Sequence, residues 1–192
     1  VAGLAEIEYV RFFGRVAEAS PIPVALQNAA AYIGIGLSPD GLAALARNHA
    51  NLRLLKGEGP AVEIAATVER TQGVFRVLNG RGGLELPDNL RAGCVGMIPA
   101  PDCFERQVTL YEAFKAGRID EAEAIYGEIA PAIVFVMQSI QHLLCYGKRL
   151  TAARLGIPFE DVHDRAPTMP PTAFGLAATK RFADALGPFA GV

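Results

Sequence analysis

Four short, unbroken apolar runs occur in the first half of the chain. Continuous apolar residues over so short a length predict buried strands, at residues 23–27, 52–56, 74–78 and 94–98. The stretches around them have the apolar spacing of amphipathic helices, at residues 4–18, 39–48, 61–70 and 84–91. Ser38-Pro39 supplies a cap residue and a first-turn proline for the second of these helices. Strands that alternate with helices are typical of a parallel sheet covered by helices, which predicts an α/β unit over residues 1–103.

Beyond Pro99 the pattern is helical only, so residues 104–192 are expected to form a helical extension. The predicted helices there cover residues 104–115, 119–129, 131–154 and 173–185. Pro131 is interpreted as the start of the third helix because proline is tolerated in a first helical turn. Residues 133–137 form an apolar segment, which we expect to be a contact surface between subunits.

Composition and charge narrow the function classes. The 192 residues are 51% hydrophobic and carry a net charge of −2, so nothing favours a nucleic-acid or lipid-binding surface. The three cysteines lack the spacing of a zinc site or a disulfide framework, and the three histidines are spread along the chain. No apolar stretch is long enough to cross a membrane. We therefore expect a cytoplasmic protein that acts on a small molecule without a metal or another cofactor.

The candidate chemistry lies where the strands end, since β/α folds carry their active sites at the carboxyl ends of the strands. Lys56, one of only four lysines, ends an apolar strand in this position. Burial can lower the pKa of a lysine, and a neutral amine adds to carbonyl carbon to form a Schiff base. Alternatively, Lys56 extends to solvent or pairs with Glu58, and position alone does not decide between these readings.

The order of the motifs resembles a known family. "PVALQN", "LSPDGLAALA", "NLRLLKGEG", "FRVLNGRGG", "LRAGCVGMIPAP", "FKAGRIDEAEAIY" and "KRLTAARLGI" follow one another as in the carboxyl-terminal two-thirds of the dihydrodipicolinate synthase and N-acetylneuraminate lyase family. The resemblance implies a (β/α)₈ TIM barrel, of which this chain holds strands five to eight, the last barrel helix and the helical extension. An open four-stranded Rossmann sheet also fits the length, but the glycine-rich dinucleotide fingerprint is absent. We expect the amino-terminal half to be missing from this sequence.

The resemblance also implies a mechanism. Family members are class I aldolases whose strand-six lysine forms a Schiff base with pyruvate or another 2-oxo acid, and Lys56 matches that lysine. The main-chain carbonyl that lines the site from strand eight matches Ile98. Asn28 and Gly80 fall on strand-end positions expected to contact the substrate. Homo-oligomers, dimers or tetramers, are expected as well.

Three positions depart from the family pattern. Gln27 stands where the family has a tyrosine that relays protons, and a carboxamide cannot be a general acid or base. We expect Gln27 to belong to the catalytic site by orienting a water or a substrate oxygen, unless it makes only a structural hydrogen bond at the strand end. Tyr32 replaces an arginine that guides the second substrate of the synthases, and Arg81 replaces an acidic residue after strand seven. Glu58 is a candidate replacement base, with a solvated loop carboxylate as the equal alternative. Arg81 suits the distal carboxylate of a substrate, unless it is a surface residue in a turn.

These departures lead to two expectations about function. The first is a Schiff-base lyase, an aldolase or a dehydratase, that acts on pyruvate-like 2-oxo acids but with a substrate different from that of the synthases. The second is a non-catalytic or regulatory paralogue of the same fold, because the tyrosine is missing. Retention of Lys56 favours the first, since a protein without turnover has no chemical need for that amine.

Overall fold

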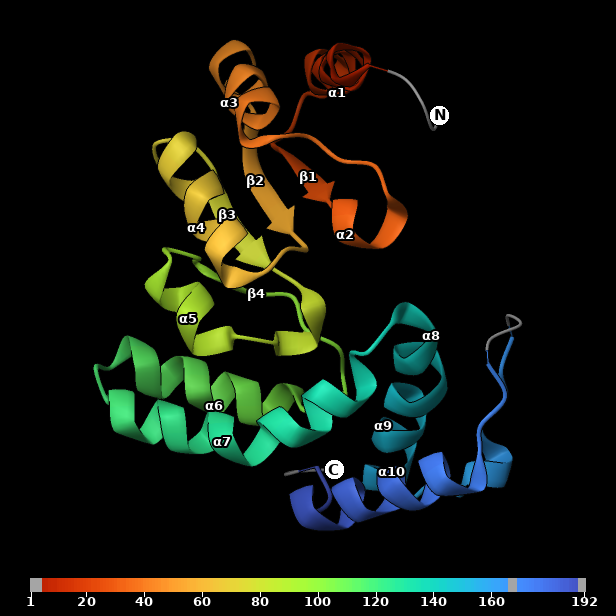
Figure 1. The fold of residues 1–192 in the computed structure, drawn as a ribbon. Helices are drawn as coiled ribbons and strands as arrows, with labels where there is room; N and C mark the ends of the chain where they lie inside the picture. The colour runs from red at the N-terminus through yellow and green to blue at the C-terminus, as the bar shows by residue number, and fades with distance from the viewer. Residues whose placement is uncertain (1–4, 166–168, 190–192) are drawn as a thin grey trace. The chain divides into compact units, whose positions relative to one another are not determined.

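A computed structural model gives the fold of this chain and describes residues 5–165 and 169–189 (Figure 1). The first residue of the predicted helix at 4–18 lies outside the described residues. The chain divides into two compact units. The first comprises the described residues up to Arg81 together with Asp88–Ile98, and the second comprises Gly82–Pro87 and the described residues from Pro99 onward.

A four-stranded parallel sheet forms the centre of the first unit. Its strands lie in the order in which they occur along the chain, namely β1 (Val24–Asn28), β2 (Leu52–Gly57), β3 (Arg76–Asn79) and β4 (Gly96–Met97). The predicted fourth strand at 94–98 was longer than β4. Its backbone nevertheless follows β3, because the amides of Val95 and Ile98 donate to the carbonyls of Val77 and Asn79.

Helices α1 (Glu6–Ala19), α3 (Pro39–Asn48) and α4 (Ala61–Arg70) pack against one face of this sheet (Figure 1). The apolar spacing predicted from the sequence accounts for this, since strand and helix residues share one buried cluster: Leu26, Leu42, Leu45, Leu52, Leu55, Ile64 and Val77. Ser38 caps α3 as predicted, and its Oγ accepts from the amide of Gly41 at 3.1 Å. The short helices α2 (Ala30–Ile33) and α5 (Leu86–Arg91) follow β1 and β3.

The second unit is helical. Its longer helices are α6 (Phe104–Lys115), α7 (Ile119–Val136) and α10 (Ala173–Leu186). Between α7 and α10, the chain forms α8 (Ile140–His142), a π-helical turn (Leu143–Gly147), α9 (Lys148–Arg154) and a 3₁₀ turn (Phe159–Asp161).

One expectation about this unit was wrong, and a second stays open. Pro131 does not begin a helix but lies inside α7, which is tolerated because the surrounding Ile129, Ala132 and Ile133 are all buried. The helix breaks later, and Ser139 caps the next one by accepting from the amide of His142. In the predicted contact segment at 133–137, Ile133, Val136 and Met137 are buried within the chain, whereas Val134 is exposed, so its role as a contact between subunits stays a prediction.

Within the described ranges, no single helix is long and apolar enough to span a membrane. Helix α7 and the segment Ile140–Arg154 are together long and apolar enough, but they are bent by 102° relative to each other. This statement rests on length and composition alone. Several side chains of both segments are buried inside the protein, so packing explains their apolar character.

Candidate functional site

The strand register places Gln27 beside Lys56. Gln27 of β1 pairs with Lys56 of β2, which pairs with Leu78 of β3. Neighbouring residues in one row of a parallel sheet point to the same face and lie about 5 Å apart. The carboxyl ends of β1 and β2 therefore bring together the two residues that the sequence predicted as catalytic.

Lys56 and Glu58 form an ion pair at the end of β2. The distance from Lys56 Nζ to Glu58 Oε1 is 2.7 Å, and the two side chains are 24% and 8% exposed. The side-chain amide of Gln27 donates to the same carboxylate oxygen at 3.3 Å. The sequence left open whether Lys56 is a partly buried amine or pairs with Glu58. In the structure the amine is both partly buried and paired with Glu58.

The loop after β3 completes the surroundings of this carboxylate. The backbone amide of Arg81 donates to Glu58 Oε2 at 2.9 Å. Gly80 leaves the space that the carboxylate fills, since a Cβ atom at this position would lie 2.3 Å from Glu58 Oε2. The amide of Gly80 also donates to the Gly57 carbonyl at 3.0 Å, which joins the two loops. Any larger residue at position 80 therefore has to displace Glu58.

Tyr32 of α2 belongs to the same group of side chains. Burial raises the pKa of its phenol, while a hydrogen bond with the Arg81 side chain and the positive charge of Arg81 oppose this rise. The negative charge of Glu58 raises the pKa further. Tyr32 and Arg81, two of the predicted substrate-binding residues, are thus in contact with each other.

The structure gives Asn28 a clear local role. Its side-chain amide donates to the Leu37 carbonyl at 2.9 Å, and its oxygen accepts from the Leu37 amide at 2.8 Å. These two bonds fix the segment between α2 and α3. The contact of Asn28 with substrate stays a prediction.

Ile98 belongs to a different strand end from Lys56. It follows β4, which is two strands away from β2 in the sheet. Its backbone amide donates to the Asn79 carbonyl at 2.7 Å. The predicted role of its own carbonyl is therefore also left as a prediction.

Asn79 was missed as a member of the site because Asn79-Gly80 was read only as the stop of a strand. Its fully buried side chain donates to the carbonyl of Gly59 at 2.9 Å and to Asn89 Oδ1 at 2.7 Å. Its own oxygen accepts from the amide of Gly80 at 2.8 Å. Asn79 therefore ties the loop after β2 to the loop after β3. Within this stretch of sequence, the available signal was a polar residue that directly follows the apolar Val77 and Leu78 at a strand end.

The side chains gathered here suit an anionic carbonyl compound. Lys56 and Arg81 carry positive charge and Glu58 carries negative charge, which leaves one positive charge in excess for a carboxylate. The amine of Lys56 is a nucleophile once it has lost a proton, and Glu58 lies within proton-transfer distance of it. No group of three histidine, cysteine, aspartate or glutamate side chains that could hold a metal occurs in the part of the chain that the structure describes.

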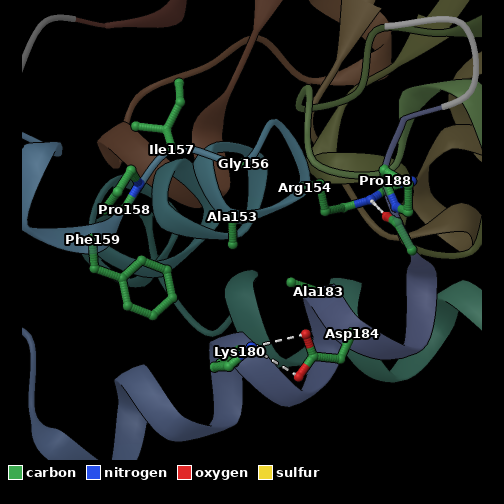
Figure 2. A pocket seen from close by; sticks show the side chains of 11 residues that line it. Ala153, Arg154, Gly156, Ile157, Pro158, Phe159, Lys180, Ala183, Asp184 and Pro188 are labelled. Atoms are coloured by element: carbon green, nitrogen blue, oxygen red, sulfur yellow. Dashed lines mark hydrogen bonds and ion pairs between the residues drawn. The ribbon is translucent and has the colours of Figure 1, made fainter.

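A separate cavity of about 550 Å³ lies in the second unit (Figure 2). Residues of α9, the following loop and α10 line it, among them Ile157, Phe159 and Ala183. At its side, Lys180 and Asp184 form an exposed ion pair one helical turn apart, at 3.0 Å. None of the predicted site residues lines this cavity. The amine at its side, that of Lys180, is exposed, whereas the amine of Lys56 is partly buried.

Proteins of known sequence provide the first comparison. No protein-family model matches the chain. It is 31% identical over 125 residues to the 4-hydroxy-tetrahydrodipicolinate synthase of Methanoculleus marisnigri, covering 64% of this chain and 42% of that protein. It is 32% identical over 122 residues to the same enzyme of Methanopyrus kandleri, covering 62% of this chain and 40% of that protein. The chain thus spans less than half the length of these relatives.

Solved structures provide the second comparison. The 4-hydroxy-tetrahydrodipicolinate synthase of Methylacidiphilum fumariolicum SolV superimposes with a TM-score of 0.82 at 22% identity, over 95% of this chain and 60% of that one. The dihydrodipicolinate synthase of Acinetobacter baumannii gives 0.82 at 18% identity, over 97% and 62%. The fold is thus that of part of a (β/α)₈ barrel with its following helices. In sequence and in fold, the chain is similar to the dihydrodipicolinate synthase family over the part that it spans, as its motifs predicted.

Proposed function

We propose that the protein is a class I lyase in which Lys56 forms a Schiff base with a pyruvate-like 2-oxo acid. The observation that carries this proposal is the position of the amine. Lys56 Nζ lies at the carboxyl end of β2, partly buried, with Glu58 Oε1 at 2.7 Å. An amine next to a carboxylate that can take its proton is suited to attack a carbonyl carbon.

The relatives support this reaction class. Those compared above are synthases of the dihydrodipicolinate family, and the A. baumannii protein was solved as a complex with pyruvate. In the proposed reaction, the amine adds to the carbonyl at C2 and loss of water leaves an imine. The protonated imine withdraws electrons from C3, so that a bond at C3 breaks and an enamine forms.

The substrate is proposed to differ from that of the relatives. Arg81 contacts Tyr32 near Glu58, at positions where the synthase pattern has different residues. A guanidinium there suits the distal carboxylate or the hydroxyl groups of a longer 2-oxo acid. Aldol cleavage that releases pyruvate and dehydration of a 2-keto-3-deoxy sugar acid are both consistent with this arrangement.

One observation favours a second candidate, a non-catalytic or regulatory paralogue. Gln27 stands at the end of β1 where the family has a tyrosine, and its amide cannot transfer protons. Such a paralogue can still bind a 2-oxo acid, but it needs no imine on Lys56.

Borohydride trapping separates these two functions. The full-length protein is incubated with pyruvate and borohydride, which reduces an imine to a secondary amine that cannot hydrolyse. A stable mass adduct on Lys56 is expected, and Lys56→Arg is expected to abolish it. An adduct on another lysine, or none with any 2-oxo acid tested, contradicts the Schiff-base function.

We further propose a cytoplasmic homo-oligomer, a dimer or a tetramer. Support for a reducing compartment comes from the three cysteines, which are buried and unpaired. The oligomer follows from the family resemblance, and light scattering of the full-length protein tests it.

A further inference from the structure

Glu58 is the centre of the hydrogen-bond network around the amine. Only 8% of its side chain is exposed. Its two oxygens accept from three groups, namely Lys56 Nζ at 2.7 Å, the Gln27 side-chain amide at 3.3 Å and the Arg81 backbone amide at 2.9 Å. These donors come from β1, β2 and the loop after β3, so the carboxylate is held in a fixed position with one oxygen on the amine.

Formation of a Schiff base requires several proton transfers at the attacking nitrogen and at the carbonyl oxygen. A group that performs them has to be titratable and has to reach the nitrogen. Gln27 lies beside Lys56 in the sheet, but a carboxamide does not titrate. Tyr32 is engaged with the Arg81 side chain. Among the described residues named here, Glu58 satisfies both conditions, because it is titratable and its Oε1 lies 2.7 Å from Nζ.

We propose that Glu58 is the catalytic acid and base for imine formation on Lys56, an inference that rests on the proposed Schiff-base function. This role differs from pairing alone. A partner that only neutralises Lys56 leaves the amine protonated, whereas a shuttle takes the proton and returns it to the departing oxygen.

The steps balance without an additional reagent. Glu58 takes a proton from the ammonium of Lys56, and the amine attacks C2, so that the nitrogen–carbon bond forms and the carbonyl π electrons move to oxygen. Glu58 returns this proton to the oxygen and then removes one from the positively charged nitrogen. It finally protonates the hydroxyl group, which leaves as water while the nitrogen lone pair closes the imine. The ammonium and the ketone thus give a protonated imine and water, and Glu58 ends as a carboxylate.

The loop after β3 fits this role. Gly80 has no side chain, and a Cβ atom there would lie within 2.5 Å of the Glu58 carboxyl carbon and both oxygens. This glycine therefore leaves the space that the carboxylate occupies when its Oε1 lies 2.7 Å from Lys56 Nζ.

The experiment measures how fast the imine forms, by stopping the reaction of the full-length protein and pyruvate with borohydride at successive times. Glu58→Gln keeps the size of the side chain but removes the titratable group, so trapping on Lys56 is expected to slow by about 100-fold to 10,000-fold. Glu58→Ala is expected to behave alike, and added formate is expected to restore its rate in proportion to its concentration. Glu69→Gln, an exposed change on α4, is the matched control and is expected to leave the rate unchanged.

The outcomes separate this inference from the proposed function. No adduct on Lys56 in the unchanged protein overturns the Schiff-base function itself. A normal adduct there, with equal rates in Glu58→Gln, overturns only the role of Glu58. If trapping is slow in Glu58→Ala and added formate does not restore the rate, Glu58 has a structural role. This result also overturns its proposed role as acid and base. If both variants unfold, Glu58→Asp decides, because a carboxylate shortened by one methylene is expected to slow trapping at least about tenfold in a folded protein.

Discussion

The side-chain amide of Asn79 donates a 2.7 Å hydrogen bond to Oδ1 of Asn89, and both side chains are fully buried. Asn79 also binds the Gly59 carbonyl and the Gly80 amide, so one side chain reaches both loops that surround Glu58. The position of the carboxylate therefore depends on a residue that does not touch Lys56 in any described contact. Support of this kind is how a fold holds reactive groups in place.

Asn79→Ala is expected to destabilise the protein and to weaken the site. The substitution leaves buried partners without hydrogen bonds, and each such group costs about 1–3 kcal/mol. We expect the free energy of unfolding to fall by about 2–4 kcal/mol, measured by urea denaturation. Trapping of pyruvate on Lys56 is expected to slow under conditions where the variant is still folded.

Asn79→Asp serves as the isosteric comparison. It retains the oxygen that accepts from Gly80 but loses the donor to Asn89 and Gly59. If both variants unfold at the same urea concentration as the unchanged protein, the buried network does not hold the loops together.

Arg81→Ala is expected to change specificity rather than imine formation. A charge-assisted hydrogen bond to an ionised group contributes about 1.5–3 kcal/mol, which corresponds to about tenfold to 100-fold in affinity. The KM for the true substrate is therefore expected to rise by this factor, while trapping of pyruvate on Lys56 continues. Steady-state kinetics and borohydride trapping measure the two effects separately.

Arg76→Ala is the matched control. Arg76 is exposed at the first position of β3, whereas Arg81 lies in the loop that follows the last position of this strand. Equal loss of trapping and turnover in Arg81→Ala indicates that Arg81 supports the fold or the position of Glu58 instead. An unchanged KM indicates that Arg81 does not bind the substrate and is an ordinary loop residue.

Gln27→Tyr tests whether the missing phenol separates this protein from its relatives. A tyrosine at the end of β1 is next to Lys56 in the strand register and supplies a hydroxyl that can transfer protons. We expect a gain of aldol cleavage with substrates common in the family, measured as released pyruvate. Gln27→Phe adds the ring without the hydroxyl, so a similar gain in that variant attributes the effect to pocket shape.

Much of the fold could be predicted from the sequence because the apolar pattern is local. Helices α4 and α6 have the bounds that the spacing predicted, and Ser38 caps α3. Pro131 was misread for a physical reason: local propensity disfavours proline inside a helix, but the burial of neighbours such as Ile129 and Ile133 compensates for one missing amide donor. Tertiary packing of this kind is not visible in a local pattern.

The site was only partly predictable for a related reason. The strand ends identified Gln27, Lys56 and Glu58 because parallel strands bring their carboxyl ends to one edge. The contacts of Asn79 and of Asn28 were not found, since they join segments whose pairing depends on the three-dimensional register. The sequence therefore indicates which residues lie at the carboxyl edge of the sheet, whereas the fold determines which of them form contacts with one another.

Asp102 gives a prediction about stability. Its carboxylate is buried, neither oxygen has a hydrogen-bond partner of normal geometry within the described residues, and burial raises its pKa from 3.8 to about 6. The nearby amides of Asp102 and Cys103 and the charge of Arg154 oppose this rise only in part. The folded protein therefore binds this proton more tightly than the unfolded chain does. The contribution of Asp102 to stability is accordingly favourable at low pH and is lost as the pH rises through about 6.

Asp102→Asn is expected to remove this pH dependence. Because pH 5 lies one unit below the folded-state pKa of about 6 and one unit corresponds to about 1.4 kcal/mol, we expect the stability of the variant relative to the unchanged protein to be about 1.4 kcal/mol higher at about pH 8 than at about pH 5. Urea denaturation at the two pH values measures this. Asp164 provides a control of opposite sign, since hydrogen bonds with Arg149 and Lys148 lower its pKa to about 2. Asp164→Asn is therefore expected to destabilise the protein at both pH values, whereas an equal effect of Asp102→Asn at both values contradicts a buried, titrating carboxylate.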